Sequence, residues 1–292
     1  MEKKQKHTGQ QSEFSKEITE MISGTYVSWD KSKEQAWSEL EKKMEEIPEK
    51  QVRIITRPLM RLAMAAAITL LVGISVFMQL YTRTINIPAG QHRDIYLPDN
   101  SRVYLNAQST LSYKPLLWRF SRHIWFEGEA YFEVVKGKKF EVTSVVGKTI
   151  VLGTGFNINS RYNEYHVTCV AGKVKVVQRI SKKEVLLQPG QKAEISSDGI
   201  IEVKSGVNTD QALSWLVNRF SFTSEPLSKV FEEIARQYGI KISVPADIDN
   251  IYTGTFRRSA SVEHVLNLVC RPFSLEFTRK SEDEYFISRS KN

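Results

Sequence analysis

The feature that most constrains this chain is an uncharged apolar run of twenty residues, Leu62 to Tyr81 (LAMAAAITLLVGISVFMQLY). At a rise of about 1.5 Å per residue, a helix of this length crosses the roughly 30 Å hydrocarbon layer of a bilayer. The alternative is a core helix of a soluble domain, but such helices seldom lack a polar stripe over this length. The run is also too long, and lies too deep in the chain, for an ordinary cleaved signal peptide. We therefore expect a permanent transmembrane helix at residues 62–81.

The charges beside this run predict its orientation. On its C-terminal side, only Arg83, Arg93 and Arg102 lie within about 20 residues of the run. Because cations near a span are retained in the cytoplasm, residues 1–61 should stay there and residues 82–292 should be exported. The cations on the N-terminal side are Lys42, Lys43, Lys50, Arg53, Arg57 and Arg61.

Residues 1–61 are polar and lysine-rich, and one stretch, Glu34 to Ile47, has the apolar spacing of an amphipathic helix that Pro48 ends. A segment this short buries little core by itself, so its aromatic residues either form a small helical cluster or bind a partner protein. Exposed aromatic stripes on marginal segments favour the partner. The predicted contact residues are Trp29, Trp37, Leu40 and Met44.

From Thr84 to about Val207, apolar and polar residues alternate, as in Ile85 and Ile87 or Val174 and Val176. This period of two predicts strands. Turn signals rich in proline and glycine recur at 88–90, 98–100, 171–172, 189–190 and 198–199. We expect residues 82–207 to form a compact antiparallel β domain.

Residues 208–292 predict a small α+β domain in which two strand-helix-strand units follow one another. The first helix should run from Pro226 to Tyr238, with Ser224 as its N-cap and Gly239 as its stop. The second should follow the cap Ser261 and extend to about Arg271.

The stretch WFEGEAYFEVV (125–135) carries the strongest candidate for catalysis. Glu127 and Glu129 on one strand face would lie about 6.6 Å apart, a spacing that two-carboxylate glycosidase chemistry permits. Glu133 shares that face, while Phe126 and Phe132 lie on the other. Solvated glutamates opposite a buried apolar face are the ordinary outcome in an antiparallel sheet. We therefore expect a structural strand whose apolar face, which also includes Ala130 and Val134, fills the core of the domain.

Other chemical motifs fail on spacing. The tripeptide GKT at 147–149 lacks the first glycine of a phosphate loop, because position 142 is Val142, and Gly153 with Gly155 lacks the third glycine of a dinucleotide site. The five histidines show no metal-ligand spacing and no G-x-S-x-G elbow occurs. The sequence therefore predicts no enzyme, metal or cofactor.

The excess of cations and the two cysteines say little about function. The net charge of +8 is scattered among acids, which argues against direct nucleic-acid binding. Cys169 and Cys270 could form a disulfide on the exported side, or each could be a buried free thiol. Their apolar neighbours favour free thiols.

Four motifs follow one another in the β region: EGEAYFEV (127–134), VLGTGFNI (151–158), VAGKVKV (170–176) and LQPGQKAEI (187–195). Together with a short leading segment and one span, they resemble the FecR family of sigma-factor regulators. The segment WLVNRFSFTSEPLSKVFEEIARQYGIKI (215–242) is similar to the C-terminal domain of FecR-like proteins of the Bacteroidetes, itself similar to the short secretin/TonB N-terminal fold. The resemblance covers residues 84–290.

This resemblance implies a single-pass inner-membrane protein with a cytoplasmic N-terminal segment and periplasmic domains. Its partners would be the signalling domain of a TonB-dependent outer-membrane receptor outside and an ECF sigma factor inside. As an anti-sigma factor or sigma regulator, it would control the transcription that this sigma factor directs. The sigma factor would contact the stripe of Trp29, Trp37, Leu40 and Met44. The other hypothesis is a membrane-anchored periplasmic binding or scaffold module without regulatory activity.

Overall fold

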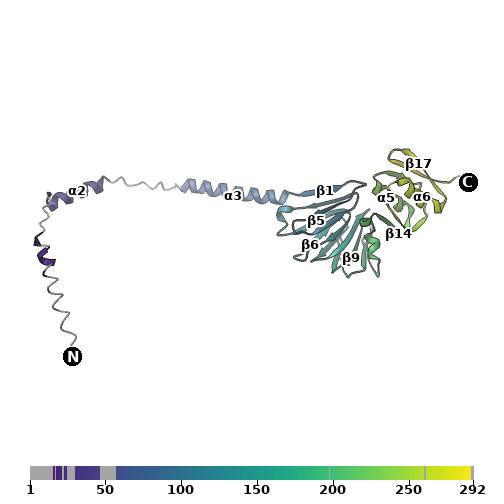
Figure 1. Ribbon diagram of the computed structural model, residues 1–292, viewed down its shortest axis with the longest axis horizontal. Coiled ribbons are helices and arrows are strands. Elements are labelled where there is room, and N and C mark those ends of the chain that lie inside the picture. The colour runs from purple at the N-terminus through teal and green to yellow at the C-terminus, as the bar shows by residue number, and fades with distance from the viewer. Residues whose placement is uncertain are drawn as a thin grey trace, which may run out of the picture. The chain divides into compact units, whose positions relative to one another are not determined.

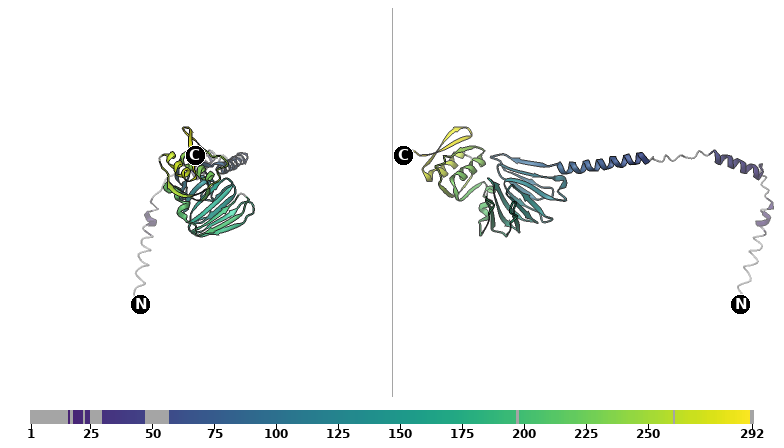
Figure 2. Two further views of the ribbon diagram at one scale, coloured as in Figure 1. Left: turned by 90° about the vertical axis from the view of Figure 1, so that its right-hand side faces the viewer. Right: turned by 180° about the vertical axis from the view of Figure 1, so that it is seen from behind.

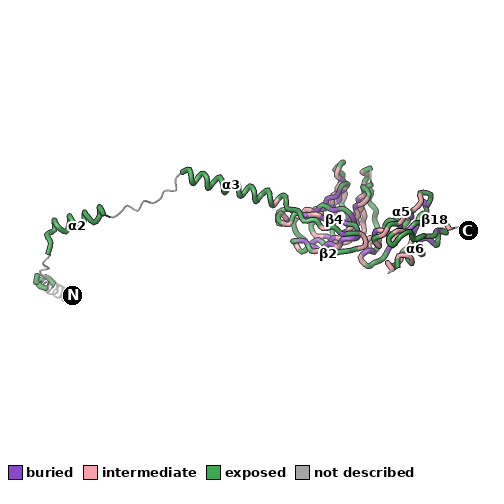
Figure 3. Tube along the Cα trace, turned by 90° about the horizontal axis from the view of Figure 1, so that it is seen from above, coloured by how far each residue is buried: buried purple, intermediate pink, exposed green. Residues whose placement is uncertain are grey.

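The computed structural model describes residues 16, 18–21, 23–24, 30–46, 57–196, 198–259 and 261–290. It divides into two units, Met1–Ala67 and Ile68–Asn292. Figure 1 shows the elements along the chain, and Figure 3 shows that the buried residues lie in the part of the chain that follows Leu80.

Helix α2 (Lys33–Glu45) confirms the amphipathic helix predicted before the span. Its N-cap is Ser32, whose side chain accepts a hydrogen bond from the Gln35 backbone amide, while the Gln35 side chain accepts one from the Ser32 amide. This capping box satisfies two amides that otherwise lack partners in the first turn. None of the helix is buried.

Helix α3 (Arg57–Leu80) contains the predicted span, but starts five residues earlier and ends one residue earlier. Pro58 is accommodated because proline suits the first turn of a helix. Among the described residues, α3 is the one helix long and apolar enough to cross a membrane, and none of its most apolar window is buried.

Thirteen strands, β1 to β13, form a sheet that folds over on itself around one core; residues 83–205 are called the β sandwich below. Figure 2 shows these strands from two further directions. The bounds are β1 (Arg83–Ile87), β2 (Arg93–Tyr96), β3 (Arg102–Leu105), β4 (Ser109–Tyr113), β5 (Arg122–Glu133), β6 (Phe140–Thr143), β7 (Gly147–Val151), β8 (Gly155–Arg161), β9 (Glu164–Ala171), β10 (Val174–Gln178), β11 (Glu184–Leu187), β12 (Gln191–Ile195) and β13 (Ile201–Ser205), with a 3-10 turn at Pro115–Leu117.

Strand β5 belongs to both halves of the sandwich. Its first residues pair with β4 and β6, and those from Gly128 onward pair with β3 and β8. The strand turns this corner at Gly128, whose φ of 112° is unfavourable for other residues. A Cβ atom there would lie 2.4 Å from the Ser109 hydroxyl oxygen, so glycine is also required by space.

The alternation predicted for residues 125–135 is confirmed. Phe126, Ala130, Phe132 and Val134 are buried in the core, while Glu127 and Glu133 are exposed. The third glutamate, Glu129, is partly buried and hydrogen-bonded. Inside the core, Phe132 stacks on Phe156 with ring centroids 5.0 Å apart. Cys169 and Cys270 are both buried and free, as their apolar neighbours predicted.

Residues 209–289, called the C-terminal module below, have a separate apolar core. Strand β14 pairs with β16, while β15, β18 and β17 form a second small sheet. Gly239 ends α5 with a φ of 71°, and Ser261 caps α6, both as predicted. The elements are α4 (Thr209–Ala212), β14 (Arg219–Pro226), α5 (Leu227–Tyr238), β15 (Lys241–Ser243), β16 (Ile251–Arg257), α6 (Val262–Cys270), β17 (Leu275–Ser281) and β18 (Glu284–Arg289), with 3-10 turns at Ser214–Val217 and Arg271–Phe273.

The predicted N-cap of α5 is wrong. Ser224 lies within β14, where the register with β16 shifts, and its backbone has a positive φ of 53°. Pro226 is the N-cap instead and makes no side-chain capping bond. Strand pairing continues to Pro226 opposite Ile251, which leaves Ser224 too far upstream to cap the helix.

Candidate functional site

Helix α2 presents the apolar stripe that the sequence predicts. Trp37, Leu40 and Met44 are 65%, 53% and 65% exposed. The fourth predicted contact residue, Trp29, lies outside the described residues, as does Ile47. Because the capping box fixes the start of the helix, the three side chains are presented together on a formed helix.

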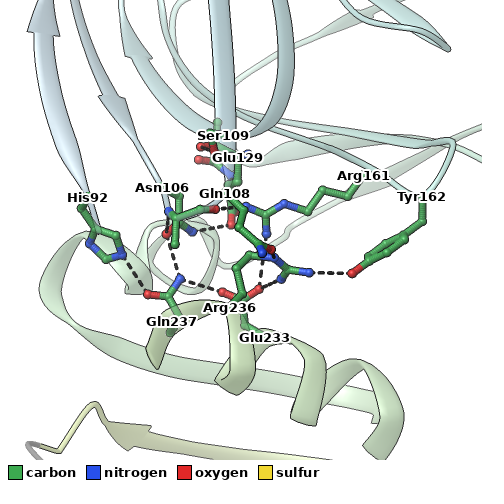
Figure 4. A network of polar contacts seen from close by, with 12 residues as sticks. His92, Asn106, Gln108, Ser109, Glu129, Arg161, Tyr162, Glu233, Arg236 and Gln237 are labelled. Atoms are coloured by element: carbon green, nitrogen blue, oxygen red, sulfur yellow. Dashed lines mark hydrogen bonds and ion pairs between the residues drawn. The ribbon is translucent and has the colours of Figure 1, made fainter. Parts of the chain in front are cut away.

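A second candidate lies at one end of the β sandwich, where polar side chains of α5 meet it (Figure 4). Arg236 and Gln237 are only 7% and 4% exposed, although both are polar. Buried polar groups are costly unless their hydrogen bonds are made. The partners of these two side chains therefore show how the module is held.

Glu233 on α5 is the centre of this junction. Its carboxylate accepts hydrogen bonds from the Arg236 guanidinium and, over 2.8 Å, from the Gln237 amide. Arg161, at the end of β8, donates to the same carboxylate over 3.4 Å. Arg161 also donates to the Ala107 carbonyl over 2.8 Å. One guanidinium therefore bonds both to the β sandwich and to helix α5 of the C-terminal module.

Arg236 and Gln237 complete the contact. Arg236 donates to the Gln108 side-chain oxygen over 3.2 Å and to the Tyr162 hydroxyl over 2.7 Å. Gln237 donates to the Asn106 side-chain oxygen over 2.8 Å, and its own oxygen lies 2.8 Å from His92 Nε2. The module is thus held by directional bonds to three separate turns of the sandwich.

Glu129 lies behind this layer. Its carboxylate accepts hydrogen bonds from Asn106 over 2.8 Å and Asn157 over 3.1 Å. Burial raises the pKa of Glu129, while the nearby Arg161 charge and the two amides oppose the shift. Two carboxylates and two guanidinium groups are therefore brought together with compensating charge.

A cavity of about 230 Å³ adjoins the junction, and its lining includes Glu129, Arg161, His166 and Trp215. Burial lowers the pKa of His166 to about 4, so the ring is neutral near pH 7. Trp215 is buried, and its indole N–H has no hydrogen-bond partner among the described residues. The groups around the cavity can recognise polar partners.

The enzyme-like motifs are dispersed. Glu127 and Glu129 lie on either side of the Gly128 corner and pair with different strands, Glu127 with β4 and Glu129 with β8. The GKT tripeptide opens β7 and no helix follows it. Gly153 lies in the bend between β7 and β8, and Gly155 begins β8. No group of three metal-binding side chains occurs within the described parts of the chain.

Sequence reasoning missed the junction. Glu233, Arg236 and Gln237 follow one another at helical spacing beside the apolar stripe of α5, which resembles an ordinary solvated face. Their partners come from turns more than 70 residues away, as the separation between Arg161 and Glu233 shows. The strong apolar face of α5 was the one local signal. It predicted that the helix packs on a sheet, but it did not predict that Arg236 and Gln237 on the polar side are also buried.

Comparison with known proteins gives consistent matches. The FecR protein family matches residues 83–175, and the family described as FecR, C-terminal, matches residues 219–287. No curated protein matches the chain significantly.

Two crystal structures of proposed anti-sigma factors from Parabacteroides distasonis ATCC 8503 share the fold. They are 26% and 25% identical to this chain, with TM-scores of 0.66 and 0.65, and each comparison covers 72% of this chain and 100% of the other. The two family matches lie in consecutive order on the β sandwich and the C-terminal module, and the motifs at 127–134 and 151–158 fall within the first. This chain therefore belongs to the FecR family of regulators.

Proposed function

We propose that this protein is a single-pass inner-membrane anti-sigma factor that relays a signal from a TonB-dependent outer-membrane receptor to a cytoplasmic ECF sigma factor. Residues 1–61 form the cytoplasmic segment, 62–81 the span, 82–207 the periplasmic β domain and 208–292 an α+β domain similar to the short secretin/TonB N-terminal fold. Membership of the FecR family and the likeness to proposed anti-sigma factors support the regulatory part.

The observation that carries the proposal is the capped helix α2 with its exposed Trp37, Leu40 and Met44. An amphipathic helix that lays its apolar face in a groove of a partner is a recurrent recognition mode, and buried aromatic anchors supply much of the binding energy. The sigma factor would cover this face together with Trp29. The basic residues before the apolar run at 62–81 support a cytoplasmic location for α2.

The test is capture of the sigma factor from cytoplasmic extract by the detergent-solubilised full chain. Trp37→Ala with Leu40→Ala should abolish capture by removing two anchors. Ser38→Ala with Lys42→Ala, on the other face of α2, is the matched control and should leave capture intact. Capture that survives the first pair would refute the assigned contact. Absence of any sigma factor with the unaltered chain would favour the scaffold alternative.

On the exported side, the receptor's signalling domain would bind by adding a strand to an open sheet edge of the C-terminal module. Strands β14 and β16 pair only with each other within the described chain, so each has an unpaired edge. Hydrogen exchange on the complex should then show new protection of backbone amides along β14 or β16. Protection confined to α5 and α6 would contradict strand addition.

A further inference from the structure

The start of the β sandwich is tied closely to helix α3. Leu80 ends α3 and Arg83 begins β1, so three Cα steps of at most about 11 Å in total join them. Arg83 is paired with Tyr113, the last residue of β4. If α3 spans the membrane, as proposed above, this end of the sandwich lies at the bilayer surface.

Strand register shows what else lies at this end. Tyr113 pairs with Ile124 near the start of β5, and Arg122 pairs with Phe140 at the start of β6. The Arg122 guanidinium also donates to the Val135 carbonyl over 3.1 Å. The Gly137 amide donates to the Leu152 carbonyl over 2.7 Å. Residues 114–121, 134–139 and 152–154 therefore gather at this end and are called the membrane-side rim below.

The rim combines exposed apolar side chains with cations. Phe120 is 78% exposed, and three other apolar side chains of the rim, Leu116, Val135 and Leu152, are also exposed. The cations Lys114, Arg119, Lys136 and Lys138 are exposed and form no ion pair with the described residues. Lys139, by contrast, is paired with Glu141 over 2.5 Å.

The turn that carries Phe120 is held in place. Trp118 is buried and packs edge-on against the rings of Tyr113 and Phe140, with centroids 5.3 and 5.9 Å away. The Phe120 and Ser121 amides both donate to the Leu117 carbonyl over 2.9 Å. The sandwich thus buries one aromatic residue of this turn while presenting the other to its surroundings.

We propose that the membrane-side rim docks on the surface of the membrane that α3 spans. Phe120, with Leu116 and Leu152, enters the boundary between headgroups and acyl chains, and the four unpaired cations bind phosphates of anionic phospholipids. Apolar side chains flanked by lysine and arginine suit this location, and lipid charge attracts cations within about 8 Å of the surface. Proximity to α3 favours lipid over a protein as the occupant.

Docking would fix the direction in which the C-terminal module points. Strand β1 runs from the rim to Ile87, and soon after it the Gly90 amide donates to the Arg236 carbonyl over 2.8 Å. The module is therefore attached at the opposite end of β1 from the rim. A sandwich resting on the bilayer would hold the module away from the membrane.

The test places spin labels on the full chain in vesicles of phosphatidylethanolamine and phosphatidylglycerol. Phe120→Cys reports the rim, and Ile200→Cys, in the exposed turn between β12 and β13, is the control. The native cysteines are buried, and burial raises their thiol pKa values to about 11 and about 12, so they react slowly with the label. Unaltered chain measures that background.

The label at position 120 should show several-fold higher accessibility to oxygen, relative to a water-soluble nickel complex, than the label at 200. Lys136→Gln with Lys138→Gln, or vesicles of phosphatidylcholine alone, should reduce this difference, whereas Lys182→Gln with Lys183→Gln should not. Equal water accessibility at 120 and 200 would overturn the inference, as would shielding of 120 that requires an added protein.

Resistance to carbonate extraction is measured on the same vesicles and tests the span separately. If the chain resists extraction but position 120 is exposed to water, docking of the rim is refuted and the span is not. A chain that is extracted refutes both the span and the docking that rests on it.

Discussion

His166, which lines the cavity beside the junction, and Glu194, its partner in the β9–β12 register, show how the surroundings of a single residue set its titration. His166 lies beside Glu164, with Nε2 3.6 Å from a carboxylate oxygen, which suggests an ion pair at first sight. Burial outweighs that attraction and lowers the pKa of the ring to about 4. By contrast, Glu194 has its pKa held at about 2, because hydrogen bonds from Lys192 and Lys204 outweigh its burial. The two groups therefore titrate in different pH ranges.

The pKa of His166 predicts acid sensitivity. Because the folded pKa is below the unfolded value of about 6.5, the unfolded chain binds more protons between these values. Stability from the neutral ring is fully present above about pH 6.5 and declines as pH falls towards 4, by at most about 3 kcal/mol. His166→Gln should flatten the pH dependence of the free energy of unfolding between pH 6.5 and 4.

Denaturant unfolding at several pH values measures this difference. Because Glu194 loses its contribution below about pH 4.5, its effect falls mostly outside the window. His264→Gln, at an exposed position on α6, is the control and should retain the slope of the unaltered chain. Identical slopes for His166→Gln and the unaltered chain would show that the ring does not titrate as described.

At the scale of elements, the spacing of apolar residues in the sequence predicted where strands and helices lie. The alternation of Ile85 with Ile87 located β1, and the apolar stripe of α5 located that helix and its stop at Gly239. The contact of α5 with the sandwich could not be predicted, because Arg161 and Glu233 are 72 residues apart and neither interrupts a pattern. Such polar contacts depend on three-dimensional placement, which periodicity does not describe.

The same contact gives a prediction for Arg236. Arg236→Met removes the bonds to Gln108 and Tyr162 and leaves Glu233 with one guanidinium partner fewer. Breaking a buried charged contact on one side typically costs about 3–5 kcal/mol. Calorimetry should show the C-terminal module unfolding in a separate transition, at a lower temperature than the sandwich.

A variant at an exposed ion pair serves as the control, because it removes a similar charge without breaking a buried contact. Lys229→Met breaks a more exposed pair with Glu164, whose N–O distance is 3.2 Å. Exposed pairs contribute about 0–1 kcal/mol, so this variant should keep the transition of the unaltered chain. If both variants shift the transition equally, the junction contributes no more than surface charge.

At the scale of the whole molecule, the two candidate sites lie on different sides of α3 along the chain. Helix α2 and its exposed stripe precede α3, while the junction, the open edges of β14 and β16 and the membrane-side rim all follow it. A relay across a membrane requires this separation. The sequence predicts such a separation from the uncharged run at 62–81 and the cations before it, since both are local properties of the chain.

Orientation is the prediction on which this arrangement depends. Alkaline phosphatase, active only after export, should be active when fused at the C-terminal end of the full chain and inactive when inserted after Lys50 with the rest of the chain retained. Lysine and arginine near a span set its direction. Glutamine at the six cations that flank the run 62–81 on its N-terminal side should therefore reduce or reverse the difference in phosphatase activity between the two fusions. Replacing Glu41, Glu45 and Glu46 by glutamine should have little effect, since acidic residues contribute weakly. Activity at Lys50 without activity at the C-terminal end would place α2 outside the cytoplasm and exclude its contact with a sigma factor.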